Sequence, residues 1–277
     1  MTSSRLNTLL FSIGFCFVTA APTSLLAAEG QKSKDTAVYA SFNAKAFMDR
    51  IEKTCEAIGL PKERQDRLVA FAKAEPEKMN KDISAALRGD TYLRMLVDKK
   101  QALPSTYAPP DLVSLRDTAY VASKKGLVLR RAAAESLKIM AQEARKQGVT
   151  LVVSSTYRSF AYQKGVYNRI VAEMGKEAAD RESAEPGHSQ HQLGLAVDFG
   201  SIDDSFAKTK AGKWLAENAI RFGWSLSYPR DFEAVTGYRW ESWHYRYVGP
   251  RVSGVIEEYF DGIQQYALEF LSRWETE

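Results

Sequence analysis

The histidines of this chain are few and are gathered into two short segments. Of the 277 residues only three are histidine. His188 and His191 lie within residues 186–199, and His244 ends the run 241–244. Imidazole nitrogens are common metal ligands and common acids or bases in catalysis. Their confinement to two segments therefore indicates one chemical site rather than chance placement.

Two carboxylates stand where they could complete such a site. His191, Asp198 and His244 together offer two imidazole nitrogens and one carboxylate oxygen, a set that suits zinc and leaves a fourth position for water. If residues 194–198 form a strand entered from a turn, Asp198 can meet His191. Glu241 lies three residues before His244. A carboxylate held there without binding the metal could act as the general base, and then the acid, of a hydrolysis.

Each of these residues also has a purely structural alternative. An isolated histidine is usually a hydrogen-bonded surface or core residue, Asp198 could cap a turn, and Glu241 could pair with an arginine. The spacing His-x6-Asp is not one of the compact motifs that identify a metal site by themselves. His188 could be a fourth ligand, a group that supports a ligand, or only part of the turn. Spacing alone leaves these readings open.

The surrounding segments predict a mixture of helices and short strands. Residues 130–147 place apolar side chains at helical spacing, and residues 162–174 are also predicted to be helical. Strands are predicted at residues 149–154, 194–199, 224–228 and 243–248. Because these elements show no regular βαβ alternation, we expect an α+β fold whose central, mainly antiparallel sheet is flanked by helices.

Helices are also predicted on both sides of this domain. Apolar residues recur at helical spacing through residues 42–90, so residues 29–92 are predicted to form an N-terminal helical segment without chemistry of its own. Cys55 falls on the first apolar stripe and is expected to be a buried core residue. Residues 96–115 are rich in proline and predict an extended connector. A C-terminal helix is expected over residues 251–277.

The first 28 residues have the pattern of a secretory signal. Arg5 is their only charge, residues 9–21 are largely apolar, and Ala27-Ala28 offers small residues for cleavage. The apolar run is shorter than the roughly 20 residues that a membrane span needs, so we predict cleavage rather than a retained anchor. Cleavage would remove Cys16 and leave Cys55 as the only cysteine, without an internal disulfide.

The overall charge narrows the choice of partners. The formal net charge is +4, and no run of lysine and arginine interleaved with aromatic residues is present. This charge is too small and too dispersed to indicate nucleic-acid binding. Since no second apolar stretch is long enough to span a membrane, we expect no membrane span after signal cleavage.

Three motifs follow one another along residues 93–250, after a connector of the form Leu-Pro-x-x-Tyr-x-Pro-x-Asp-Leu. They are Ser155-Thr156-Tyr157-Arg158-Ser159 with Gln163, Pro186-Gly187-His188-Ser189-Gln190-His191-Gln192-Leu193-Gly194-Leu195-Ala196-Val197-Asp198, and Thr236-Gly237-Tyr238 with Glu241-Ser242-Trp243-His244-Tyr245-Arg246-Tyr247-Val248-Gly249. Together they resemble the VanY-type D-alanyl-D-alanine carboxypeptidases, which are zinc peptidases grouped with lysostaphin and the hedgehog domain. The helical segment 42–90 lies outside this resemblance.

The resemblance implies a hedgehog/D-Ala-D-Ala peptidase-like fold and a role for each site residue. His191, Asp198 and His244 would bind Zn²⁺, and Glu241 would be the general base and then the acid. Arg158 would stabilise the oxyanion, as a preorganised cation does. Gln163 and Ser189 would contact the terminal D-residue of the substrate and its carboxylate, and Trp243 and Tyr228 would line the pocket.

A few positions depart from the family pattern. Gln190 stands where glutamate is frequent, Leu193 where threonine is frequent, and Ser242 where proline is common. None of these is an implied ligand or the implied base, so the departures concern the pocket rather than the metal chemistry. His188 is not a ligand in this reading.

The function implied is zinc-dependent D,D-carboxypeptidase action on peptidoglycan stem peptides, in the periplasm or cell envelope. An L,D-carboxypeptidase or a peptidoglycan endopeptidase of the same family would share the metal set. A non-catalytic, zinc-stabilised wall-binding module is the alternative from another class. Glu241 and Arg158 favour an enzyme, because a structural zinc site has no use for a carboxylate that does not bind the metal.

Overall fold

The computed structural model describes residues 42–276, and the predicted signal, residues 1–28, lies outside them. The helices are α1 (Ala44–Ala57), α2 (Lys62–Ala74), α3 (Pro76–Leu87), α4 (Thr91–Arg94), α5 (Arg131–Lys146), α6 (Phe160–Met174), α7 (Lys176–Glu182), α8 (Lys210–Asn218), α9 (Glu233–Thr236), α10 (Gly249–Phe260) and α11 (Gln264–Thr276), with short 3-10 helices η1 (Gln190–Leu193), η2 (Asp204–Lys208) and η3 (Ala219–Phe222). The strands are β1 (Leu112–Ser114), β2 (Val121–Ala122), β3 (Val128–Arg130), β4 (Val152–Ser155), β5 (Ala196–Phe199), β6 (Trp224–Leu226) and β7 (His244–Tyr247).

One sheet carries most of the motif residues. Its strand order is β2-β4-β5-β7-β6, and every pair in it is antiparallel except β2 with β4. β1 and β3 form a separate antiparallel pair within the segment that leads into the sheet. The predicted strands are observed as β4, β5, β6 and β7, and the predicted helices over residues 130–147 and 162–174 as α5 and α6. The α+β prediction is therefore confirmed.

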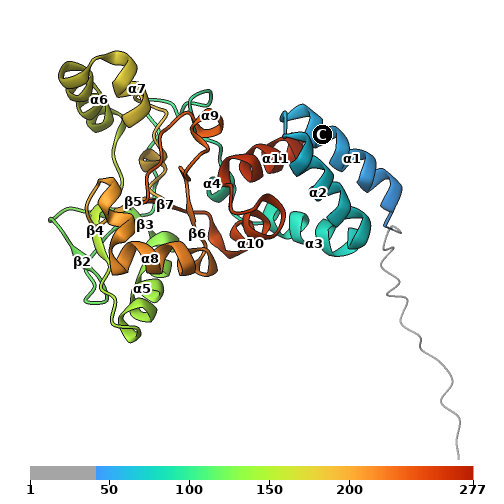
Figure 1. The fold of residues 1–277 in the computed structure, drawn as a ribbon. Coiled ribbons are helices and arrows are strands. Elements are labelled where there is room, and N and C mark those ends of the chain that lie inside the picture. The colour runs from blue at the N-terminus through green and yellow to red at the C-terminus, as the bar shows by residue number, and fades with distance from the viewer. Residues whose placement is uncertain (1–41, 277) are drawn as a thin grey trace, which may run out of the picture. The chain divides into compact units, whose positions relative to one another are not determined.

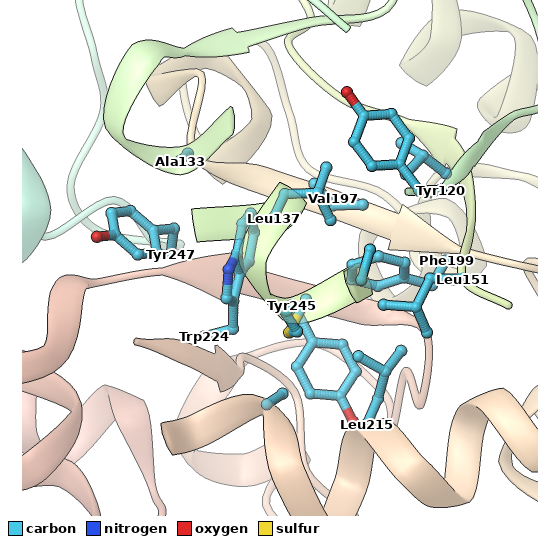
Figure 2. Close-up of a cluster of buried hydrophobic side chains, with 14 of the residues drawn as sticks. Tyr120, Ala133, Leu137, Leu151, Val197, Phe199, Leu215, Trp224, Tyr245 and Tyr247 are labelled. Atoms are coloured by element: carbon cyan, nitrogen blue, oxygen red, sulfur yellow. The ribbon is translucent and has the colours of Figure 1, made fainter. Parts of the chain in front are cut away.

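An apolar core between the sheet and helices α5 and α8 holds the strands in place (Figure 2). Phe199 of β5 packs edge-on against Tyr245 of β7, with ring centroids 5.9 Å apart, and against Trp224 of β6 at 6.3 Å. Successive residues of a strand point to opposite faces of the sheet. Since Phe199 and Tyr245 face this core, Asp198 and His244 project from the other face.

A second apolar cluster joins the two ends of the described chain. In Figure 1, α1, α2 and α3 lie beside α10 and α11, and their buried side chains form one cluster. Phe47 of α1 meets Trp274 of α11 with ring centroids 5.6 Å apart. Cys55 is buried in this cluster as a free thiol, and burial raises its pKa to about 12. The expected core role of Cys55 is confirmed.

The C-terminal segment differs from its prediction. A single helix was expected over residues 251–277, but α10 ends at Phe260 and α11 begins at Gln264. Asp261 and Gly262 between them have φ angles of +53° and +75°, a left-handed conformation that ends a helix. Arg64 of α2 contacts the Asp261 carboxylate at 2.6 Å, which helps to hold that unusual backbone. Within residues 42–276, no helix is both long and apolar enough to cross a membrane.

Candidate active site

Three side chains that lie far apart in the sequence converge on one face of the sheet. His191 of η1, Asp198 of β5 and His244 of β7 are buried, and one candidate ligand atom from each lies within 4.8 Å of the others. Nε2 of His191 is 3.2 Å from Oδ2 of Asp198, and Nδ1 of His244 is 3.0 Å from Oδ1. His188 is outside this group, and its Nδ1 contacts the Asp98 carbonyl at 2.7 Å.

Local structure explains the convergence. Asp198 and His244 are directly opposite each other in the antiparallel pairing of β5 with β7, which places their side chains on the same face. Ser189 caps η1 by accepting the His191 backbone N–H. Gly194 ends η1 at a φ of +69°, where a Cβ would lie 2.9 Å from Cδ2 of Leu112. Glycine at this turn therefore lets His191 sit beside the start of β5.

Each imidazole is oriented by a partner on its outer nitrogen. Nδ1 of His191 lies 2.7 Å from the Thr156 carbonyl oxygen, which can only accept, so Nδ1 carries the proton. Nε2 of His244 lies 3.2 Å from Oε1 of Gln190. In a neutral ring, the other nitrogen then presents its lone pair to the Asp198 carboxylate. Lone pairs that face a carboxylate across about 3 Å favour a cation between them.

The residues present fit a zinc ion. Two neutral imidazoles and one carboxylate are a common three-ligand set for catalytic zinc. Burial and the nearby Arg158 lower the pKa of His191 to about 4, so this ring is neutral at pH 7, as metal binding requires. A small cavity of about 40 Å³ lies against His191 and His244, space for an ion or a water molecule.

Glu241 is buried next to these residues. Its Oε2 is 3.6 Å from Nδ1 of His244, and its backbone N–H donates to the Tyr228 carbonyl. Burial and the nearby Asp198 charge raise the pKa of Glu241 well above its ordinary value. A carboxyl group of this kind can accept a proton near neutral pH and return it, which is what a general base and acid must do.

Arg158 reaches the same place from the loop after β4. Its Nη2 contacts Oδ2 of Asp198 at 2.6 Å, its Nε donates to Ser155 Oγ at 3.0 Å, and Nη1 lies 3.4 Å from Gln163 Oε1. The guanidinium is thus fixed on three sides. It also lines a cleft of about 330 Å³ that Asp198, Glu241 and Trp243 share. A charge held in this way can stabilise an anion that forms in the cleft.

The residues predicted to contact substrate surround the same space. Gln163, Ser189 and Tyr228 line the small cavity, and Trp243 lines the cleft. The amide nitrogen of Gln163 donates to the Ala184 carbonyl at 2.7 Å, and the Tyr228 ring centroid is 4.8 Å from that of His244. The structure therefore brings all the predicted site residues together, and substrate contact by these four remains a prediction.

Some supporting groups were not predicted. Thr156 orients His191 through its backbone carbonyl, which every residue type possesses, so its side chain carries no signal for this role. Gln190 was noted only as a departure from the family pattern. Arg239 also enters the cleft, where it pairs with Glu182 at 2.6 Å and lies over the Trp243 ring at 5.1 Å. Glu182 lies 57 residues before Arg239 in the sequence, so no local pattern indicates that the two side chains pair.

Comparison with known proteins extends these observations. Residues 126–250 match the VanY family, described as D-alanyl-D-alanine carboxypeptidase. YodJ of Bacillus subtilis (strain 168), which is named as a carboxypeptidase, is 37% identical over 185 residues, covering 61% of this chain and 67% of that protein.

Two solved structures are similar to the described fold. The LD-carboxypeptidase LdcB has 37% identity and a TM-score of 0.55, covering 61% of this chain and 85% of that one. A variant of the D,D-pentapeptidase VanY from a VanB-type vancomycin resistance cassette, solved with Zn(II), has 33% identity and a TM-score of 0.52, covering 62% of this chain and 96% of that one. The motifs, the fold and these similarities agree, and the chain belongs to the VanY family of D-alanyl-D-alanine carboxypeptidases.

Proposed function

We propose that this protein is a zinc-dependent D,D-carboxypeptidase that removes the terminal D-alanine from peptidoglycan stem peptides. The observation that carries the proposal is the buried Glu241 carboxylate beside His191, Asp198 and His244, whose ligand atoms lie within 4.8 Å of one another. A similar VanY enzyme solved with Zn(II) supports zinc as the metal.

His191, Asp198 and His244 would hold the zinc ion. Bound zinc would lower the pKa of a water molecule and polarise the scissile carbonyl. Glu241 would take the proton from the attacking water and give it to the nitrogen of the departing D-alanine. Arg158 would donate hydrogen bonds to the oxygen that becomes negative in the tetrahedral state. Its contacts with Ser155 and Asp198 hold the guanidinium in place before the substrate binds.

The cleft would bind the stem peptide with its C-terminus towards the small cavity. Gln163 and Ser189 line that cavity, near the place where the last D-residue and its carboxylate would lie. Tyr228 would close the cavity, and Trp243 would form part of the wall of the cleft. A peptide entering from the cleft would thus present its last peptide bond beside Glu241.

An L,D-carboxypeptidase is the second candidate, because LdcB is 37% identical to this chain. Such an enzyme would use the same metal-binding residues and the same Glu241. The two candidates differ in which stem peptide loses its terminal residue, so substrate masses separate them.

The test incubates the purified protein with defined tri-, tetra- and pentapeptide muropeptides and measures product masses. Loss of one alanine from the pentapeptide alone is the expected result, whereas loss from the tetrapeptide would establish the second candidate. Glu241→Ala should retain zinc by elemental analysis and lose about 10²–10⁴-fold in turnover, the usual contribution of a general base and acid. Glu217→Gln, an exposed change on α8, is the control. Undiminished turnover by Glu241→Ala would contradict the mechanism.

We also propose that the protein acts in the periplasm or cell envelope, since residues 1–28 have the pattern of a secretory signal. Leu10→Arg puts a charge into the apolar run of the predicted signal and should keep a tagged protein in the cytoplasmic fraction. Unchanged export of that variant would contradict the proposal.

A further inference from the structure

Behind the proposed metal ligands lies a buried row of polar side chains that the proposed reaction does not use. Gln190, Ser227 and Gln264 are 4%, 3% and 2% exposed. Gln264 is the first residue of α11 and lies outside residues 126–250, which match the family. A polar side chain buried this deeply costs stability unless its hydrogen-bonding groups are satisfied.

The contacts form a continuous path from the sheet to a proposed ligand. Nε2 of Gln264 donates to the Ser225 carbonyl at 3.3 Å and to Ser227 Oγ at 3.3 Å. Nε2 of Gln190 donates to Gln264 Oε1 at 3.2 Å. Gln190 Oε1 then accepts from Ser227 Oγ at 2.7 Å and lies 3.2 Å from Nε2 of His244.

The Ser225 carbonyl, at the end of the path away from His244, fixes which groups along the path donate and which accept. A backbone carbonyl can only accept, so the Ser225 carbonyl requires the amide nitrogen of Gln264 to face it. Oε1 of Gln264 must then face Gln190, and it can only accept. Gln190 is therefore turned with its nitrogen towards Gln264 and its oxygen towards His244. An amide oxygen beside Nε2 of His244 requires the ring proton to be on Nε2.

We infer that Gln264 is a positioning residue for the metal site: through Gln190 it keeps the proton of His244 on Nε2 and leaves Nδ1 free to bind the metal. This inference rests on the proposed zinc site. It also gives α11 a part in the chemistry, because the first turn of this helix supplies the group that orients Gln190. The remainder of α11 packs in the cluster with α1 and α10.

The chain supplies a matched control at the next position. Gln265 is also buried on α11, and its Nε2 donates to Oδ2 of Asp98 at 2.7 Å. It takes no part in the path to His244. Replacing either glutamine with methionine removes a buried hydrogen-bonding amide at similar size. Only Gln264→Met interrupts the path.

The first measurement reads the proton position directly, in protein freed of metal. With three histidines in the chain, ¹⁵N-histidine labelling gives few signals. Long-range ¹H–¹⁵N correlation at pH 8, above the pKa of about 6.5 of an ordinary imidazole, identifies the protonated nitrogen of each ring. Wild type and Gln265→Met should show His244 protonated on Nε2, and Gln264→Met should show a loss of that form. His191, held by the Thr156 carbonyl, should remain protonated on Nδ1 in all three.

The second measurement is zinc affinity, by competition with a chelating dye. Partners of ligating histidines typically contribute about 10–100-fold to metal affinity, so Gln264→Met should bind zinc about tenfold more weakly and Gln265→Met as tightly as wild type. If Gln264→Met does not fold, Gln190→Met interrupts the same path at its next amide. Either variant with an unchanged His244 proton position and zinc affinity would overturn the inference. A wild-type protein that binds no zinc would instead overturn the proposed function, and the metal-free spectra would still test the amide path.

Discussion

His191 and His244 are oriented by partners of different kinds. The Thr156 carbonyl accepts from His191 and belongs to the backbone, so substitutions at position 156 leave it in place. Gln190 accepts from His244 through a side chain, so a single substitution can remove it. The residues around His244 are thus where changes in sequence can most readily adjust the proposed metal site.

Replacement of Arg158 should test its proposed role on the oxyanion. Arg158→Lys keeps a positive charge but cannot reproduce a planar group that contacts Asp198, Ser155 and Gln163 together. We expect kcat on a pentapeptide substrate to fall about 10²–10³-fold, as when an oxyanion donor is lost, with a smaller change in KM. Steady-state kinetics check this. A raised KM with unchanged kcat would instead assign Arg158 to ground-state binding.

At the scale of single residues, the sequence identifies the candidate metal ligands more readily than the groups that orient them. Three histidines in two segments draw attention to His191 and His244, the neighbouring carboxylates add Asp198 and Glu241, and the family resemblance adds Arg158. The groups that orient them are a backbone carbonyl and side chains from α11 and η1. A carbonyl has no residue signature, and Gln264 contacts Gln190 only because the chain folds back across the sheet.

Among the elements, β5 and β7 matter most for the site, because their register pairs Asp198 with His244. Alternation within each strand gives one face to the core and the other to the site. Long periodic segments such as α5 were predictable, since five buried positions recur on one face. Strand β2 has only two residues, and a strand this short has no periodicity to read.

Two helix glycines provide opposite tests of packing. A Cβ added at Gly212 of α8 would lie 2.1 Å from the Phe206 carbonyl oxygen, whereas one at Gly165 of α6 would meet nothing within 4 Å. Gly212→Ala should therefore destabilise the protein by at least about 1–3 kcal/mol through overpacking. Gly165→Ala should stabilise it by about 0.5–1 kcal/mol because alanine favours helix. Urea unfolding measures both, and equal effects of the two changes would contradict the described packing.

At the scale of the whole molecule, two apolar clusters stabilise different parts of the described fold. One holds the sheet and the proposed site, and the other joins α1, α2 and α3 to α10 and α11. The helical segment 42–90 was predictable from its periodicity. The packing of this segment against the C-terminal helices was not predictable. An amphipathic helix shows that one of its faces is buried but not which element buries it.

A polar contact across the second cluster should make stability depend on pH. Asp82 of α3 accepts from the Tyr259 hydroxyl of α10 at 2.7 Å and from Lys78 at 3.0 Å. Burial opposes its charge, but these hydrogen bonds lower the net pKa of Asp82 below its ordinary value. A lowered pKa contributes stability above the unfolded-state value of about 3.9, and this contribution is lost as the pH falls through the folded-state value.

Asp82→Asn should therefore lower the free energy of unfolding at pH 7 by about 0.2–1 kcal/mol, the range for solvent-exposed ion pairs. The difference from wild type should be smaller at pH 3, below the unfolded-state pKa, than at pH 7. Urea unfolding at both pH values measures it. Asp66→Asn, which removes an ion pair within α2, is the control and should change little. A difference that grows in acid would contradict the assignment.

The pairing of the earliest described helices with the last two has a consequence for biosynthesis. A ribosome delivers α1 to α3 long before α10 and α11, and in the interval their apolar faces have no native surface to cover. Such exposed faces are the ones that associate wrongly or recruit chaperones. Synthesis of α10 and α11, rather than emergence of the sheet, is therefore the step that allows the second cluster to form.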